Sequence, residues 1–225
     1  MSYDAVLFDN DGVLVDPPAS KTLTDGTRAA FAELGVDEPD TEHVRAVRTS
    51  ATVDALREVC ETHGFDHETF WEARDRNNER AQLTEFRAGD RGVYSDVAAL
   101  DSLSQDKGIV SSNHHTLVEY ILENYGLASH FETCYGRPKT VESIRLKKPN
   151  PHYLERALDD LDVSPDAALY VGDSERDAVA ADRAGMDSVF LRRPDWKTVE
   201  LSVTPTYEAT DLHGVVTVAR ERPNP

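Results

Sequence analysis

The chain has 225 residues, enough for one sizeable domain or for a medium domain with a smaller one beside it. Its 42 acidic residues outnumber the 24 lysines and arginines, which gives a formal net charge of −18. This balance argues against nucleic acid as a partner, because phosphate backbones require a basic surface.

The composition also bears on where the protein works. No run of residues approaches the roughly 18 apolar residues that a membrane-spanning helix needs, and Met1 is not followed by the pattern of a secretory signal. We therefore expect a cytoplasmic protein with no membrane partner. The acidic composition resembles that of proteins from salt-loving archaea, in which abundant counter-ions screen such a surface, so we expect a halophilic protein.

Four short apolar runs predict buried strands. The runs cover residues 5–8, 108–110, 167–171 and 188–191, and each is continuous rather than alternating. Such runs are typical of strands in a parallel sheet that is covered on both faces. Helical patterns over residues 114–125, 151–161 and 175–184 separate the later runs. The alternation predicts an α/β fold with a Rossmann-like, doubly wound parallel sheet.

Residues 17–91 break this alternation. They contain no apolar strand, only helical periodicity, with helix starts at Asp40 or Thr41, within residues 50–52, and at Asp66. The segment is too long for a connecting loop. We therefore predict an all-helical cap, residues 17–91, inserted into a catalytic core formed by residues 1–16 and 92–225.

Polar residues follow three of the predicted strands. They are Asp9, Asn10 and Asp11 after the first run, Ser111, Ser112 and Asn113 after the second, and Asp173 with Asp177 after the third. The carboxyl ends of parallel strands meet at one edge of a sheet, where ligands bind. We therefore expect these side chains to share one site.

The residue types at this edge favour phosphoryl transfer. Carboxylates suit a hard cation such as Mg²⁺, whereas a lysine suits a phosphate, and either Lys148 or its neighbour Lys147 can supply it. Ser111, or the adjacent Ser112, would donate to phosphate oxygens. Because no activated serine or cysteine motif is in view, a carboxylate is the plausible nucleophile.

Four segments together resemble a known family. LFDNDGVLVD, VSSN, KKPNP and GDSERD stand in the order and spacing of the four motifs of the haloacid dehalogenase superfamily. The resemblance spans about residues 4–192 and is strongest to the phosphoglycolate phosphatase-like and beta-phosphoglucomutase-like branch, which has a helical cap after the first motif.

The resemblance implies a role for each catalytic residue. Asp9 would attack phosphorus and form an aspartyl-phosphate, and Asp11 would protonate the leaving oxygen and then activate water. Ser111 would hold a phosphate oxygen, and Lys148 would bridge the nucleophile and the phosphate. Dehalogenases of the family lack the second aspartate, so Asp11 disfavours dehalogenation.

The resemblance also implies a Mg²⁺ site and candidate substrate contacts. Asp9, Asp173 and the backbone carbonyl of Asp11 would bind the metal. Asp177 would orient or join this set, although an acidic residue in the first turn of a helix also has a structural use. The candidate substrate-binding residues are Asn10, Ser112, Asn113 and, in the cap, Arg48.

These expectations combine into one predicted function with two alternatives. We predict a Mg²⁺-dependent phosphoric monoester hydrolase that acts on small phosphorylated metabolites, phosphoglycolate being one candidate, as a monomer or small homo-oligomer. A phosphosugar mutase of the beta-phosphoglucomutase type would use the same aspartates but pass the phosphoryl group to a second hydroxyl. A catalytically idle protein would bind phosphate esters without turnover.

Overall fold

The computed structural model describes residues 2–193 and 201–221. The contacts within the chain divide it into two units. The sheet unit comprises Met1–Asp16, Val93–Gly136 and Lys147–Pro225, and the helical unit comprises Pro17–Gly92 and Arg137–Leu146. No helix among the described residues is long and apolar enough to cross a membrane.

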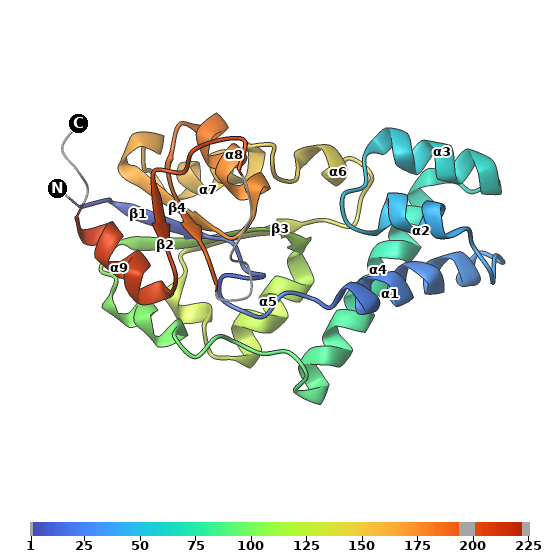
Figure 1. Ribbon diagram of the computed structural model, residues 1–225, viewed down its shortest axis with the longest axis horizontal. Helices are drawn as coiled ribbons and strands as arrows, with labels where there is room; N and C mark the ends of the chain where they lie inside the picture. Colours follow the sequence, from blue (N-terminus) through green and yellow to red (C-terminus); the bar gives the residue numbers. More distant parts are fainter. Residues whose placement is uncertain (1, 194–200, 222–225) are drawn as a thin grey trace. The chain divides into compact units, whose positions relative to one another are not determined.

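A six-stranded sheet forms the centre of the described sheet unit (Figure 1). Its strands are β1 (Ala5–Phe8), β2 (Asp106–His114), β3 (Thr133–Arg137), β4 (Ala168–Gly172), β5 (Asp187–Leu191) and β6 (Tyr207–Ala209). The spatial order is β3-β2-β1-β4-β5-β6, and β1 pairs in parallel with both β2 and β4. The strand order therefore reverses beside β1, which is where such sheets bind ligands.

Helices cover both faces of this sheet. They are α5 (His115–Asn124), α7 (His152–Leu161), α8 (Glu175–Ala184) and α9 (Leu212–Arg220), with short 3₁₀ helices η1 (Val97–Ser102), η2 (Ala128–His130) and η3 (Pro165–Ala167). Figure 1 shows α7 and α8 on one face and α5 and α9 on the other. Every residue of β1 and β4 is buried. The prediction of a doubly wound parallel sheet is confirmed. The continuous apolar runs indicated it because strands that are covered on both faces have no polar side to alternate with.

The helical unit has its own core. Its helices are α1 (Ser20–Glu33), α2 (Thr41–Arg48), α3 (Val53–His63), α4 (His67–Ala88) and the short α6 (Ser143–Leu146). Phe31, Phe70 and Trp71 pack at its centre with aliphatic neighbours from several helices. The side chains of Asp40, Thr52 and Asp66 accept hydrogen bonds from backbone N–H groups in the first turns of α2, α3 and α4. These caps confirm the three helix starts expected from the sequence.

Arg137–Leu146 group with the helices rather than with the sheet. Arg137 makes two short contacts with the Asp75 carboxylate of α4, at 2.6 and 2.9 Å, and Ile144 packs into the helical core. The sequence pattern predicts that these residues belong to the core domain, because nothing in it reveals that the partner of Arg137 lies 62 positions earlier.

Candidate active site

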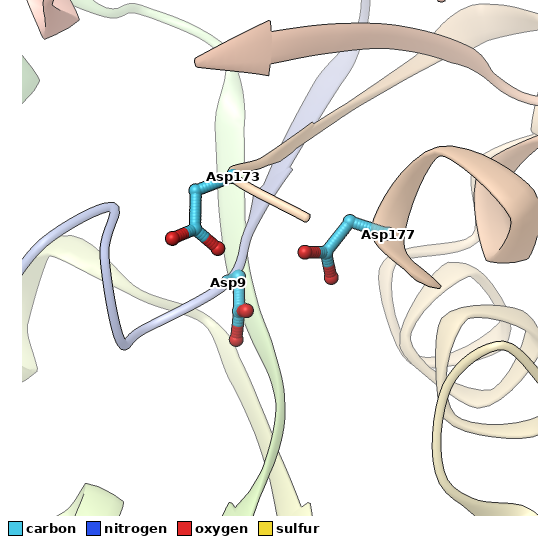
Figure 2. A group of neighbouring side chains, drawn as sticks. All are labelled: Asp9, Asp173 and Asp177. Carbon is cyan, nitrogen blue, oxygen red and sulfur yellow. The ribbon is translucent and has the colours of Figure 1, made fainter. Parts of the chain in front are cut away.

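Three carboxylates converge at the carboxyl ends of the central strands. Asp9 follows β1 directly, Asp173 follows β4, and Asp177 lies in the first turn of α8. Figure 2 shows the three side chains as neighbours, with those of Asp173 and Asp177 turned toward Asp9. One oxygen from each lies within 4.8 Å of an oxygen of the other two. The parallel register of β1 with β4 brings these distant segments together.

Lys148 joins this cluster from the segment before α7. Its Nζ lies 3.0 Å from Asp9 Oδ1 and 2.5 Å from Asp177 Oδ1, and it also donates to the backbone oxygen of Val110. Its side chain is 4% exposed, whereas Lys147 is only partly buried. Of the two lysines that the sequence left open, Lys148 is the one that contacts the carboxylates.

The three carboxylates differ in the direction of their pKa shifts. Burial raises the pKa of Asp9 to about 7 and that of Asp173 to about 8, and in both cases neighbouring carboxylates add to the effect. Burial acts on Asp177 in the same direction, but Lys148 and the donors of Ser174 outweigh it and lower its pKa. The same carboxylates raise the pKa of Lys148 in spite of its burial. Asp177 thus forms the firmer ion pair with Lys148, whereas at Asp9 and Asp173 the lysine only partly offsets the effects of burial and of the neighbouring carboxylates.

Asp177 also has a structural task. Its carboxylate accepts from the backbone N–H of Ser174, and the Ser174 side chain in turn caps α8, so the two residues form a capping box. A Cβ on Gly172 would lie 2.2 Å from Asp177 Cβ, so only glycine permits this close approach. Both roles considered for Asp177 are therefore consistent with its position.

Asp11 lies beside the cluster, and its carboxylate accepts a hydrogen bond from Asn113. Its Oδ2 accepts from Nδ2 of Asn113 at 2.8 Å, and its Oδ1 is 3.3 Å from Nδ2 of Asn10. The backbone N–H of Asn10 donates to Asp9 Oδ1 at 2.7 Å. Asn10 and Asn113 are expected from the sequence to contact the substrate, whereas in the structure both amide side chains point to Asp11.

The remaining predicted residues occupy different surroundings. Ser111 lies within β2, which continues to His114 and so beyond the predicted end of the strand at residue 110. Ser111 is buried, and its Oγ accepts from the backbone N–H of Asn113. Ser112 is partly exposed and, as the next residue in the strand, points to the opposite face. Arg48 belongs to the helical unit, where it donates to the hydroxyls of Ser20 and Thr24 at 2.7 and 3.0 Å. Its contact with a substrate stays a prediction.

Tyr170 is a site residue that the sequence motifs do not include. Its hydroxyl lies 2.6 Å from Lys148 Nζ, 3.0 Å from the oxygen of Val110 and 3.2 Å from Asp177 Oδ1. Burial, with Asp177 next, raises its pKa well above the usual value, so it remains a neutral phenol. The sequence does contain a signal for this role, because a tyrosine in a strand that is buried on both faces needs a hydrogen-bond partner for its hydroxyl.

The carboxylate cluster fits a magnesium ion. Its donors are all oxygens, which Mg²⁺ prefers, and a divalent cation would stabilise the charged forms of Asp9 and Asp173, which burial and the neighbouring carboxylates disfavour. Asp9, Asp173 and Asp177 would hold the ion. Asp11 Oδ2 accepts from Asn113 instead, and the metal contact expected for the backbone oxygen of Asp11 stays a prediction.

Two curated relatives match most of the chain in sequence. The chain is 27% identical over 216 residues to a 5′-nucleotidase from Pseudomonas aeruginosa, covering 94% of this chain and 93% of that protein. It is 28% identical over 205 residues to a phosphoglycolate phosphatase from Colwellia psychrerythraea, covering 84% of each.

Solved structures and a family model extend the comparison. CbbY from Rhodobacter sphaeroides, solved in complex with phosphate, shares the fold with a TM-score of 0.70 at 19% identity, covering 95% of this chain and 96% of that one. The family model described as haloacid dehalogenase-like hydrolase matches residues 6–191, from β1 to the end of β5. The resemblance seen in the four motifs is thereby confirmed, and the chain belongs to the haloacid dehalogenase-like hydrolases and is an enzyme.

Proposed function

We propose that this enzyme is a Mg²⁺-dependent phosphatase of small phosphorylated metabolites that works through an aspartyl-phosphate on Asp9. The observation that carries the proposal is the contact of Lys148 with Asp9 inside the carboxylate cluster. A lysine is not a ligand for a cation, so a site that only bound a metal ion would not need one. It is useful where a phosphate must be held beside a carboxylate nucleophile.

Two steps account for hydrolysis. In the first, an oxygen of Asp9 bonds to phosphorus while the ester P–O bond breaks, and Asp11 gives a proton to the departing oxygen. In the second, a water attacks phosphorus, Asp11 takes a proton from it, and the bond from phosphorus to Asp9 breaks. Inorganic phosphate leaves and both aspartates return to their starting state.

The remaining groups would stabilise the negative charge of the phosphate. Lys148 and the Ser111 hydroxyl would hold phosphate oxygens and offset the charge that builds on them. Asp9, Asp173 and Asp177 would hold a magnesium ion, which would supply further positive charge at the site. Tyr170 would keep Lys148 in place through its 2.6 Å contact with Nζ.

Small monoesters are the substrate class best supported. The two relatives are named for a nucleotide and for phosphoglycolate, both small phosphate esters. The net charge of −18 disfavours polyanions such as nucleic acids. We therefore propose a compact phosphate ester as the substrate.

The test is release of inorganic phosphate. The substrates are 4-nitrophenyl phosphate, phosphoglycolate, a nucleoside 5′-monophosphate, pyrophosphate and a hexose phosphate, each with Mg²⁺ or with a chelator, at high salt. Wild type is compared with Asp9→Asn. The matched control is Asp4→Asn, which changes an exposed aspartate at the other end of β1.

We expect metal-dependent release that disappears in Asp9→Asn and persists in Asp4→Asn. Conversion of one phosphosugar isomer into another without net release would instead identify a mutase. Tight binding of the esters with no turnover by folded wild type would identify a binding protein. Either of these results would overturn the proposal.

A further inference from the structure

The orientation of the Asn113 side chain is fixed by its neighbours. Its Oδ1 accepts from the backbone N–H of His114 at 2.9 Å, and its own backbone N–H donates to Ser111 Oγ at 3.1 Å. The amide therefore directs its amino group away from His114 and toward Asp11, whose Oδ2 lies 2.8 Å away. Asn113 stands at the end of a sheet strand, so the donor is held on a rigid element.

The backbone around Asp11 is equally constrained. The Asn10 carbonyl accepts from the N–H groups of Val13, Leu14 and Val15, and Gly12 N–H donates to the Val15 oxygen. The turn thereby fixes the Cα position of Asp11 and leaves its side-chain torsions as the main freedom. The bond from Asn113, at 2.8 Å, is shorter than the 3.3 Å contact from Asn10 and restrains those torsions more firmly.

We propose that Asn113 is a positioning residue for Asp11 in the acid step. The inference rests on the proposed function, because it concerns how Asp11 delivers its proton. The Asn113 amino group donates to Oδ2 at 2.8 Å, whereas the Asn10 amino group lies farther from Oδ1, at 3.3 Å. Oδ2 is therefore the firmer acceptor, and the proposal places the transferable proton on Oδ1. When the ester P–O bond breaks, this proton moves from Oδ1 of Asp11 to the departing oxygen, and the carboxylate that remains keeps its bond from Asn113.

This role has a kinetic signature that a structural role lacks. A 4-nitrophenolate ion is a good leaving group and departs with little need of a proton, whereas an alkoxide such as that from phosphoglycolate requires one. A misplaced Asp11 should therefore lower kcat/KM, which reports the first step, much more for the alkyl ester than for the aryl ester, whereas the second step is common to both. General destabilisation or a distorted phosphate site would slow both esters alike.

The test compares two variants on two esters. Asn113→Ala removes the whole amide, and Asn113→Asp keeps an oxygen for the His114 N–H while removing the donor to Asp11. We expect kcat/KM for phosphoglycolate to fall about tenfold or more in both variants, and kcat/KM for 4-nitrophenyl phosphate to fall less than about threefold. Melting temperatures identify any variant that is not folded, and the other variant then carries the test.

A double-mutant cycle with Asp11→Asn supplies the second readout. Once Asp11 can no longer give a proton, adding Asn113→Ala should cause no further selective loss with phosphoglycolate. Equal losses on both esters, or a full additional loss in the double variant, would overturn the positioning role. Failure of wild type to release phosphate from any ester would instead contradict the proposed function, so the two failures are distinguishable.

Discussion

The backbone of Gly12 lies against the carboxylate of Asp173. A Cβ built on Gly12 would fall 1.9 Å from Asp173 Oδ2, and the residue has a φ of +78°. Gly12, in the first of the four family motifs, therefore has to be glycine because Asp173, in the last motif, occupies the space that a side chain would need. The turn after β1 and the end of β4 fit together only because this residue has no side chain.

Gly12→Ala should disturb the site far more than an ordinary turn substitution. Positive φ alone costs about 1–2 kcal/mol for alanine, and the overlap with Asp173 must in addition push that carboxylate aside. We expect a larger loss in the free energy of unfolding, measured by urea titration, together with a loss of Mg²⁺-dependent activity. Gly126→Ala is the control, since Gly126 has a φ of +69° and an added Cβ would meet nothing within 4 Å. Equal effects in the two variants would contradict the requirement.

Asp173 should make the metal-free protein less stable as the pH rises. Its pKa in the folded protein is about 8, against an ordinary value of 3.8, so the folded state binds more protons between these values. Its contribution to stability is therefore full below the lower value and is lost as the pH rises toward the upper one. In chelator, the melting temperature should fall over this range, and Asp173→Asn should reduce the fall.

Mg²⁺ should reverse the same effect. An ion held by the carboxylate cluster of the folded protein would favour the charged carboxylates, so we expect its stabilisation to be greater near pH 8 than near pH 5. Asp4→Asn is the control for removing one negative charge. The account is wrong if Asp173→Asn shows the same pH dependence of stability as wild type. It is also wrong if Mg²⁺ stabilises wild type and Asp173→Asn equally.

Lys148→Met should abolish activity and lower stability, whereas Lys147→Met should do neither. Lys148 is buried between Asp9 and Asp177, and removing one member of a buried ion pair costs about 3–5 kcal/mol. Lys147 is partly exposed. Phosphate release and urea unfolding measure the two effects. Activity retained by Lys148→Met would remove the lysine from the proposed mechanism.

Asp75→Asn should release Arg137–Leu146 from the helical unit. Asp75 is fully buried and pairs with both Arg137 and Arg74, so its loss leaves two buried guanidinium groups without their counter-charge and should cost about 3–5 kcal/mol. Glu79→Gln is the matched control, because Glu79 also lies in α4 and pairs with Lys139, but with more exposure. Amide hydrogen exchange in residues 137–146 should accelerate in the first variant only.

The acidic surface should make folding depend on salt. With a net charge of −18, repulsion between surface carboxylates grows as counter-ions are removed. We expect circular dichroism to show loss of structure after dialysis into dilute buffer and its return in concentrated salt. An unchanged spectrum in dilute buffer would contradict the halophilic expectation.

The elements that the sequence revealed are those whose pattern reflects burial on both faces. The runs at β1, β2, β4 and β5 were visible for this reason, and the start and end signals located α5, α7 and α8. By contrast, β3 has the mixed sequence TCYGR, and β6 has only three residues. These are the edge strands, which lack the continuous apolar pattern of a central strand.

The site shows the same division between local and long-range information. Asp9 and Asp173 follow apolar strands, so their meeting could be foreseen from the topology. The contacts of Asn113 with Asp11 and of Tyr170 with Lys148 depend on side chains 102 and 22 positions apart. No periodicity records such pairs, because each forms only when the sheet is assembled.

The contact of Arg137 with Asp75 limits how this enzyme can be recombined with its relatives. The chain passes between its units at residues 16 and 17, 92 and 93, 136 and 137, and 146 and 147. A chimera that exchanges only residues 17–92 would leave Arg137 facing a foreign helix and Ile144 without its core. The transplantable module is therefore a pair of segments, and the second of them ends one residue before Lys147.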